Sequence, residues 1–176
     1  MTDSGTWRHG GGQSVTFETI VDTARQHQKV GGRIYVSTDS FPSGSECVFA
    51  TVICLYNETL RKGGTYFYQR HMVNPKSVSN LRERMLLEAQ KSIDLSMTLF
   101  DCGVSDLEVH LDISPKGTPH ATSRYADMLS GYATGVGLDC RVKPDAWAAS
   151  VADRHSKAVY AQDNDYALND KPELVF

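Results

Sequence analysis

Segments with apolar residues at helical spacing alternate along the chain with short β-rich runs, and this pattern predicts the order of the elements. In residues 15–28 the apolar positions recur every three or four residues, which predicts a peripheral helix. Three runs rich in Val, Ile, Tyr, Phe and Thr follow at 33–40, 46–56 and 64–72. Because the connections between these runs are short, we expect three consecutive antiparallel strands.

The second half of the chain mixes both kinds of pattern. Residues 77–103 carry an apolar stripe at helical spacing, and residues 106–113 alternate between apolar and polar positions as a strand does. A helix over 119–135, a fifth strand over 138–142 and a last helix from Pro144 onward complete the prediction. The predicted element order is therefore α-β-β-β-α-β-α-β-α.

Composition limits the class of protein. With 176 residues, 40% hydrophobic and 22% charged, the chain is long enough for one domain with a buried core. We expect a flexible leader over 1–13, the domain over 14–160 and a polar tail over 161–176. No apolar run is long enough to span a membrane, and the start lacks the apolar core of a secretory signal, so a cytoplasmic protein is the expectation.

Neither the cysteines nor the net charge points to a function. The four cysteines are scattered without the spacing of a zinc site, and we expect them to be reduced. The net charge of −3 provides no global field that attracts polyanions. If the protein binds nucleic acid, a local basic patch or metal ions must supply the attraction.

Three acidic residues occupy places where a fold can bring them together. Asp39 comes at the predicted end of the first strand and Asp112 at the predicted end of the fourth, each followed by turn-forming residues. Glu88 lies at the border of the apolar stripe of its helix. Each also has an ordinary interpretation: Asp39 as a turn residue, Glu88 in an ion pair with a helix neighbour, and Asp112 on the wet face of an edge strand.

Several strings in order resemble the YkuK family, which has a ribonuclease H-like fold and is catalogued as a domain of unknown function. They are YVSTDS, KGGTYFY, LRERMLLEA, HLDI, GYATGVG and KPDAWAASVADRHSK, and together they run from Arg33 to Lys157. The resemblance implies an α/β, ribonuclease H-like fold whose five-stranded mixed sheet has the order β-β-β-α-β-α-β-α, with flanking helices and the extra N-terminal helix.

The resemblance also implies a set of site residues. Ribonuclease H-like enzymes place four acids on the first strand, the following helix, the fourth strand and the last helix, and the first three correspond to the acids found above. The matching positions are Asp39, Glu88, Asp112 and either Asp145 or Asp153. We favour Asp145 because it begins the helix, keep Asp153 as the rival, and regard His155 as a more distant option.

Clustered carboxylates repel one another, and a divalent cation relieves that repulsion. Hard oxygen ligands favour Mg²⁺ or Mn²⁺, so the resemblance implies a two-metal site that hydrolyses phosphodiester bonds. The metal ligands would be Asp39, Glu88, Asp112 and Asp145. Candidate phosphate contacts are Lys116, Lys143 and Arg154, with Lys76 and Arg124 further options.

The expected function is a nuclease acting on RNA, an RNA/DNA hybrid or structured DNA, and the expected partner is nucleic acid, with no membrane and with a homodimer left open. A non-catalytic nucleic-acid or protein-binding module of the same fold is the alternative. An ATP-handling protein is disfavoured, because no glycine-rich phosphate loop follows the first strand. We expect Trp147 to belong to the core.

Overall fold

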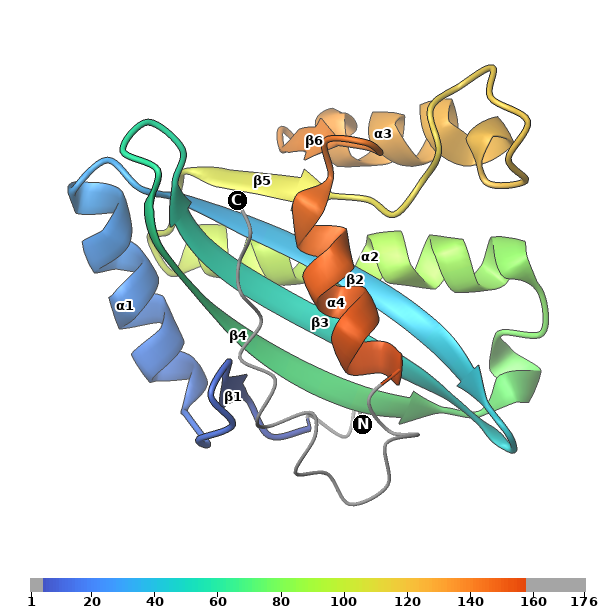
Figure 1. The fold of residues 1–176 in the computed structure, drawn as a ribbon, viewed down its shortest axis with the longest axis horizontal. Helices are drawn as coiled ribbons and strands as arrows, with labels where there is room; N and C mark the ends of the chain where they lie inside the picture. The colour runs from blue at the N-terminus through green and yellow to red at the C-terminus, as the bar shows by residue number, and fades with distance from the viewer. Residues whose placement is uncertain (1–4, 158–176) are drawn as a thin grey trace.

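The molecule is built on one six-stranded mixed sheet, and the computed structural model describes residues 5–157 (Figure 1). Across the sheet the strands are β1 (Arg8–His9), β4 (Lys62–Val73), β3 (Glu46–Asn57), β2 (Arg33–Ser43), β5 (Leu107–His110) and β6 (Asp139–Arg141). The pairs from β1 to β2 are antiparallel, and β2–β5 and β5–β6 are parallel. This arrangement confirms the predicted mixed sheet and the three-stranded meander. The predicted count of five strands is wrong, because β1 has only two residues and too short a pattern to recognise.

Helices cover both faces of the sheet, as Figure 1 shows. The helices α1 (Phe17–Lys29), α2 (Leu81–Asp101) and α3 (Ala126–Gly135) share one hydrophobic core with the sheet. Helix α4 (Trp147–Lys157) crosses the opposite face and packs its small residues against the aromatic side chains of β2, β3 and β4. Alanines along this helix let it approach the sheet closely. The predicted tail, 161–176, lies outside the described residues.

Strand β2 continues beyond its predicted end. It was expected to stop at Ser40, but its pairing with β3 persists to Ser43, which faces Glu46 across a tight turn. Gly44 in that turn has a φ of 56°, a conformation that glycine adopts without steric cost. The hairpin therefore absorbs the turn-rich segment after Asp39, and Asp39 lies within the strand.

The starts of two predicted helices are also corrected by the structure. Helix α2 begins at Leu81, because the Asn80 side chain accepts a hydrogen bond from the Glu83 amide and caps it. The helix expected over 119–135 begins only at Ala126, after a short 3₁₀ turn. Another short 3₁₀ turn, Pro75–Ser77, precedes α2.

The fourth predicted strand is shorter than expected, because β5 ends at His110, and the last helix begins at Trp147 instead of Pro144. The alternative that treats this strand as an edge strand with a wet polar face is wrong, since β5 lies between β2 and β6 and its polar residues Glu108 and His110 are 2% and 0% exposed. Glu108 forms ion pairs with Arg33 and with Arg141. The His110 ring bonds Glu108 at 2.9 Å, and its Nδ1 accepts a hydrogen bond of 3.0 Å from the Ala148 amide. Together these contacts fix the start of α4 over β5.

The described helices bear on the expectation that the chain contains no membrane span. Of the helices within residues 5–157, none combines the length and apolar character needed to cross a bilayer.

Candidate carboxylate site

Asp39 lies in β2, the strand between the antiparallel and parallel parts of the sheet. It is 6% exposed, and its carboxylate accepts a hydrogen bond of 2.7 Å from the Ser156 hydroxyl on α4. Side chains alternate between the faces of a strand, and Tyr35, four residues earlier, packs against α4. Asp39 therefore points to the α4 face of the sheet.

Asp112 lies beside Asp39, although it follows the end of β5 by two residues. The strands β2 and β5 pair in parallel with Val36 opposite Val109. Continued for three more residues, this register places Asp112 at the level of Asp39. The Asp112 side chain is 24% exposed and pairs with the Lys143 ammonium at 2.5 Å.

Glu88 approaches from the opposite face of the sheet. It lies half-buried on α2 and accepts a hydrogen bond from the hydroxyl of Ser40, the residue after Asp39. Thr38, the residue before Asp39, bonds to Ser92 of the same helix at 2.9 Å. The alternation along β2 thus separates Glu88 from Asp39 by the thickness of the strand.

The last helix contributes Asp153 to this region. The charge of Asp153 raises the pKa of Asp39, and its carboxylate pairs with Lys157, one turn later, at 2.6 Å. Asp145 instead is exposed and precedes α4, about 14 Å along the helix axis from the end that contacts Asp39. The preference for Asp145 assumed that the start of the helix lies nearest the acids, whereas the structure brings its C-terminal end there.

We define Asp39, Glu88, Asp112 and Asp153 as the acid cluster. Burial raises the pKa of Asp39 to about 7, and the charges of Asp112 and Asp153 add to that effect. Burial, together with the charges of Asp39 and Asp112, raises the pKa of Glu88 to about 8. The hydroxyls of Ser156 and Ser40 act in the opposite direction. These carboxylates therefore carry unfavourable electrostatic energy when ionised.

The acid cluster suits a hard divalent cation in its charge and in its oxygen donors. However, in the part of the chain that the structure describes, no three His, Cys, Asp or Glu side chains come close enough to hold one metal ion. Two causes are visible: Glu88 lies on the other face of β2, and the amines of Lys143 and Lys157 already pair with Asp112 and Asp153. The predicted two-metal site is thus not confirmed.

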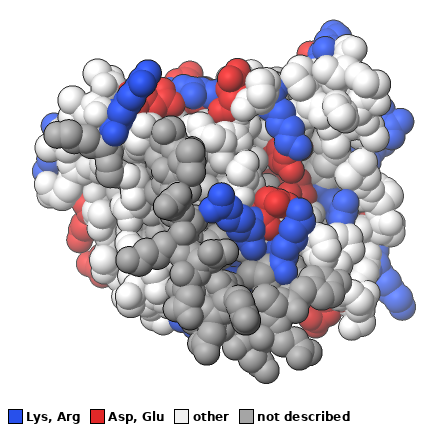
Figure 2. Space-filling view, in the orientation of Figure 1, with Lys and Arg blue, Asp and Glu red and all other residues white. Residues whose placement is uncertain are grey.

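The predicted phosphate contacts are spread over the surface. Lys143 lies at the acid cluster, but Lys116 forms an exposed ion pair with Asp127 at 2.5 Å. Arg154 is exposed on α4, Lys76 is exposed in the 3₁₀ turn before α2, and the Arg124 guanidinium lies over the Tyr125 ring at 4.9 Å. Figure 2 shows acidic side chains near the middle of the α4 face with basic side chains around them.

The sequence analysis did not find three side chains of this region: Lys157, Ser156 and Ser40. Lys157 is four residues after Asp153 on a helix, a spacing that predicts an ion pair, whereas no sequence pattern identifies the two serines. His155, the distant option for the fourth position, is buried: its Nε2 lies 3.0 Å from the Tyr66 hydroxyl, and its ring stacks on Tyr68. Burial and nearby arginines lower its pKa to about 3, which indicates a neutral structural residue.

Comparisons with known proteins agree with this fold. A family model described as Ribonuclease H-like matches residues 15–157. The chain is also similar to "Uncharacterized protein YkuK" of Bacillus subtilis (strain 168), with 25% identity over 178 residues that cover 89% of this chain and 100% of that protein. No solved structure matches the chain significantly. The predicted resemblance is confirmed.

Proposed function

The chain belongs to the ribonuclease H-like family, and from that premise we propose that it is a metal-dependent nuclease hydrolysing phosphodiester bonds in RNA, RNA/DNA hybrid or structured DNA. The family supports the broader role of a nuclease-like or nucleic-acid-binding module. The acid cluster supports the narrower one, because clusters of carboxylates are the usual ligands of Mg²⁺ or Mn²⁺ in phosphodiester hydrolysis.

The observation that carries the proposal is the burial of the Asp39 carboxylate within β2, beside Asp112 and near Asp153 of α4, whose charges with that burial raise the pKa of Asp39. A protein gains no stability from burying acids that repel one another, so their presence favours a role that uses the negative charge. Ribonuclease H-like enzymes carry acids at the same places in the fold.

The three acids on the α4 side, Asp39, Asp112 and Asp153, are the proposed metal ligands, and Glu88, on the other face of β2, is the fourth acid of the proposed site. A bound divalent ion would activate water and stabilise the leaving oxygen. The protein holds these carboxylates on rigid elements and places Lys143 and Lys157 beside them. When substrate binds, the two amines can exchange their carboxylate partners for a phosphate of the substrate.

Calorimetric titration with Mn²⁺ and Mg²⁺, paired with cleavage assays on labelled RNA/DNA hybrid, single-stranded RNA and branched DNA, tests the proposal. We expect the wild type to bind metal and cleave one substrate class, and Asp39→Asn to lose both. Because Glu88 is farther from the other acids, Glu88→Gln should weaken metal binding less than Asp39→Asn does. Asp94→Asn, an exposed acid on the helix of Glu88, is the matched control and should behave as wild type.

A second candidate is a nucleic-acid-binding module without turnover. It is favoured by one observation, the pairing of Asp112 with Lys143 and of Asp153 with Lys157, which neutralises two of the four acids without a metal. A folded wild type that binds oligonucleotide but no Mn²⁺ at millimolar concentration would support this candidate and contradict the nuclease.

A further inference from the structure

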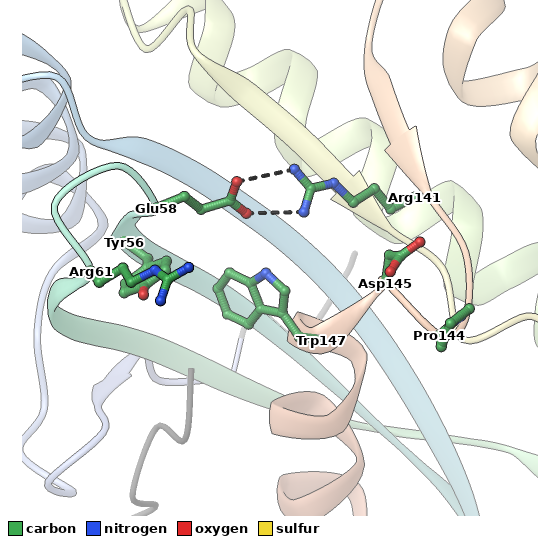
Figure 3. Close-up of a pocket in the computed structure, with 7 residues that line it drawn as sticks. All are labelled: Tyr56, Glu58, Arg61, Arg141, Pro144, Asp145 and Trp147. Atoms are coloured by element: carbon green, nitrogen blue, oxygen red, sulfur yellow. Dashed lines mark hydrogen bonds and ion pairs between the residues drawn. The ribbon is translucent and has the colours of Figure 1, made fainter.

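A pocket of about 650 Å³ opens at the start of α4, away from the acid cluster. Figure 3 shows its lining, in which two arginines, two acids and two aromatic rings face the same space. The lining residues are Tyr56, Glu58, Arg61, Arg141, Pro144, Asp145 and Trp147. Its volume lies in the range of pockets that enclose a small organic molecule.

Two charged side chains of the pocket have no partner within residues 5–157. Glu58 and Arg141 satisfy each other through hydrogen bonds of 2.9 and 3.3 Å. In contrast, the side chains of Arg61 and Asp145 form no hydrogen bond or ion pair with any other described residue. Figure 3 shows the Arg61 side chain extending from the β3–β4 turn towards the Trp147 indole. The pocket thus offers one cation and one anion to a ligand.

Arg61 also has an unusual backbone. Its φ of 46° makes it the one non-glycine residue with a positive φ in the described chain. A non-glycine residue in this conformation costs energy and persists only where its surroundings compensate, and such residues occur in turns and at functional sites. Glycine would suit the turn better, so the presence of arginine points to a use for its guanidinium.

Trp147, which forms the aromatic side of the pocket, is held in place by neighbouring tyrosine rings. Trp147 is half-buried, with Tyr35 at 4.7 Å and Tyr56 at 6.0 Å between ring centroids. This agrees with its predicted place in the core, while its remaining surface lines the pocket. Tyr35 is fully buried beneath it, with its hydroxyl beside Glu58 of the pocket lining.

We propose that this pocket holds one nucleobase of a bound nucleic-acid strand, with the base stacked on Trp147, its exocyclic amino group donating to Asp145, and a neighbouring phosphate contacting Arg61. Aromatic rings bind unstacked bases, carboxylates accept hydrogen bonds from base amino groups, and arginine binds phosphate. Adenine, cytosine and guanine carry such an amino group, whereas uracil and thymine do not.

The pocket lies on the same face of the sheet as Asp39, Asp112 and Asp153 of the acid cluster. Trp147 and Asp153 are six residues apart on α4, which is about 9 Å along the axis, or the length of two to three stacked nucleotides. One strand can therefore reach both places. This inference rests on the proposed nucleic-acid substrate and adds a subsite that selects the base beside the phosphate to be cleaved.

Fluorescence titration of Trp147 tests the subsite without any cleavage. The protein carries Asp39→Asn, EDTA removes metal, and Trp7→Phe leaves Trp147 as the only tryptophan. The probes are the RNA pentamers A₅, C₅ and U₅ and the monophosphates AMP, CMP and UMP. We expect A₅ and C₅ to quench the emission and to bind about tenfold more tightly than U₅. Tighter binding of pentamers than of monophosphates assigns the pocket to a strand, and equal binding assigns it to free nucleotides.

Two variants and a control separate the contacts. Arg61→Gly should weaken binding of every pentamer about tenfold, while its melting temperature stays equal or rises because the strained φ is relieved. Asp145→Ala, which removes the acceptor oxygens, should abolish the preference for A₅ and C₅ over U₅. Arg82→Ala, which removes an exposed arginine of α2, should change nothing.

The inference is overturned if U₅ binds as tightly as A₅, or if Arg61→Gly binds like the Arg82→Ala control. The two proposals fail separately. If the protein binds bases in EDTA but the wild type never cleaves nucleic acid, the base-binding pocket stands and the nuclease proposal fails. If the wild type cleaves and Arg61→Gly does not change that cleavage, the nuclease proposal stands and the base-binding pocket fails.

Discussion

Replacing Asp39 by asparagine should stabilise the protein, and the gain should depend on pH. The pKa of Asp39 is raised from 3.8 to about 7 in the folded state, so between these values the folded protein holds a proton that the unfolded chain has lost. Stability therefore falls as pH rises through this window, and the loss is complete above the folded pKa. At about 1.4 kcal/mol per pKa unit, the upper limit is about 4 kcal/mol. Sharing of charge within the acid cluster makes about 2 kcal/mol a realistic gain.

Urea unfolding of wild type and Asp39→Asn at several pH values, in EDTA, measures this difference. The asparagine oxygen can still accept the hydrogen bond from Ser156, so the change removes charge and little else. We expect the variant to be more stable by about 2 kcal/mol near pH 8, with the difference vanishing near pH 4. Excess Mg²⁺ at about 100 times its Kd should raise the free energy of unfolding of the wild type, but not of the variant, by about 2.7 kcal/mol.

The control is Asp94→Asn, whose carboxylate is exposed on α2 and whose replacement should produce no such pH dependence. An Asp39→Asn variant that is less stable than the wild type near pH 8, or whose stability difference is the same at every pH, would refute the electrostatic account of the acid cluster.

Three further substitutions test neighbouring contacts. Glu88→Gln should stabilise the protein by an amount that grows as pH rises from 4.5 to about 8 and is kept above that, because burial and the charge of Asp39 raise the pKa of Glu88; urea unfolding against pH measures this gain, and a difference that is the same at every pH contradicts it. Ser156→Ala should raise the pKa of Asp39, since the serine hydroxyl lowers it; carboxyl NMR titration follows that pKa, and an unchanged value argues against the contact. Arg141→Met should cost about 3 kcal/mol of unfolding free energy by leaving buried Glu108 with Arg33 as its remaining arginine, while Arg154→Met, at an exposed site, should cost little.

Local patterns were sufficient to locate most of the elements and three of the four acids. The helical stripe of α2 and the alternation of β5 depend on which residues are apolar, and burial of those residues is what forms the elements. The same patterns put Asp39 and Asp112 at predicted strand ends and Glu88 at the border of a helix stripe, where a fold can bring them together. The choice between Asp145 and Asp153 could not be made in this way, because both lie near one helix and only the direction in which that helix crosses the sheet separates them.

The sequence by itself thus determined the order of strands and helices, the family and the presence of acids near the middle of the sheet. The tertiary structure decided how those acids face one another. Pairing with β3 extends β2 past Asp39, and the alternation of a continuous strand then directs Asp39 to α4 and Ser40 to Glu88. The ion pair of Lys143 with Asp112, and the pocket around Trp147, likewise join residues from separate elements or depend on where α4 lies, which no local pattern records.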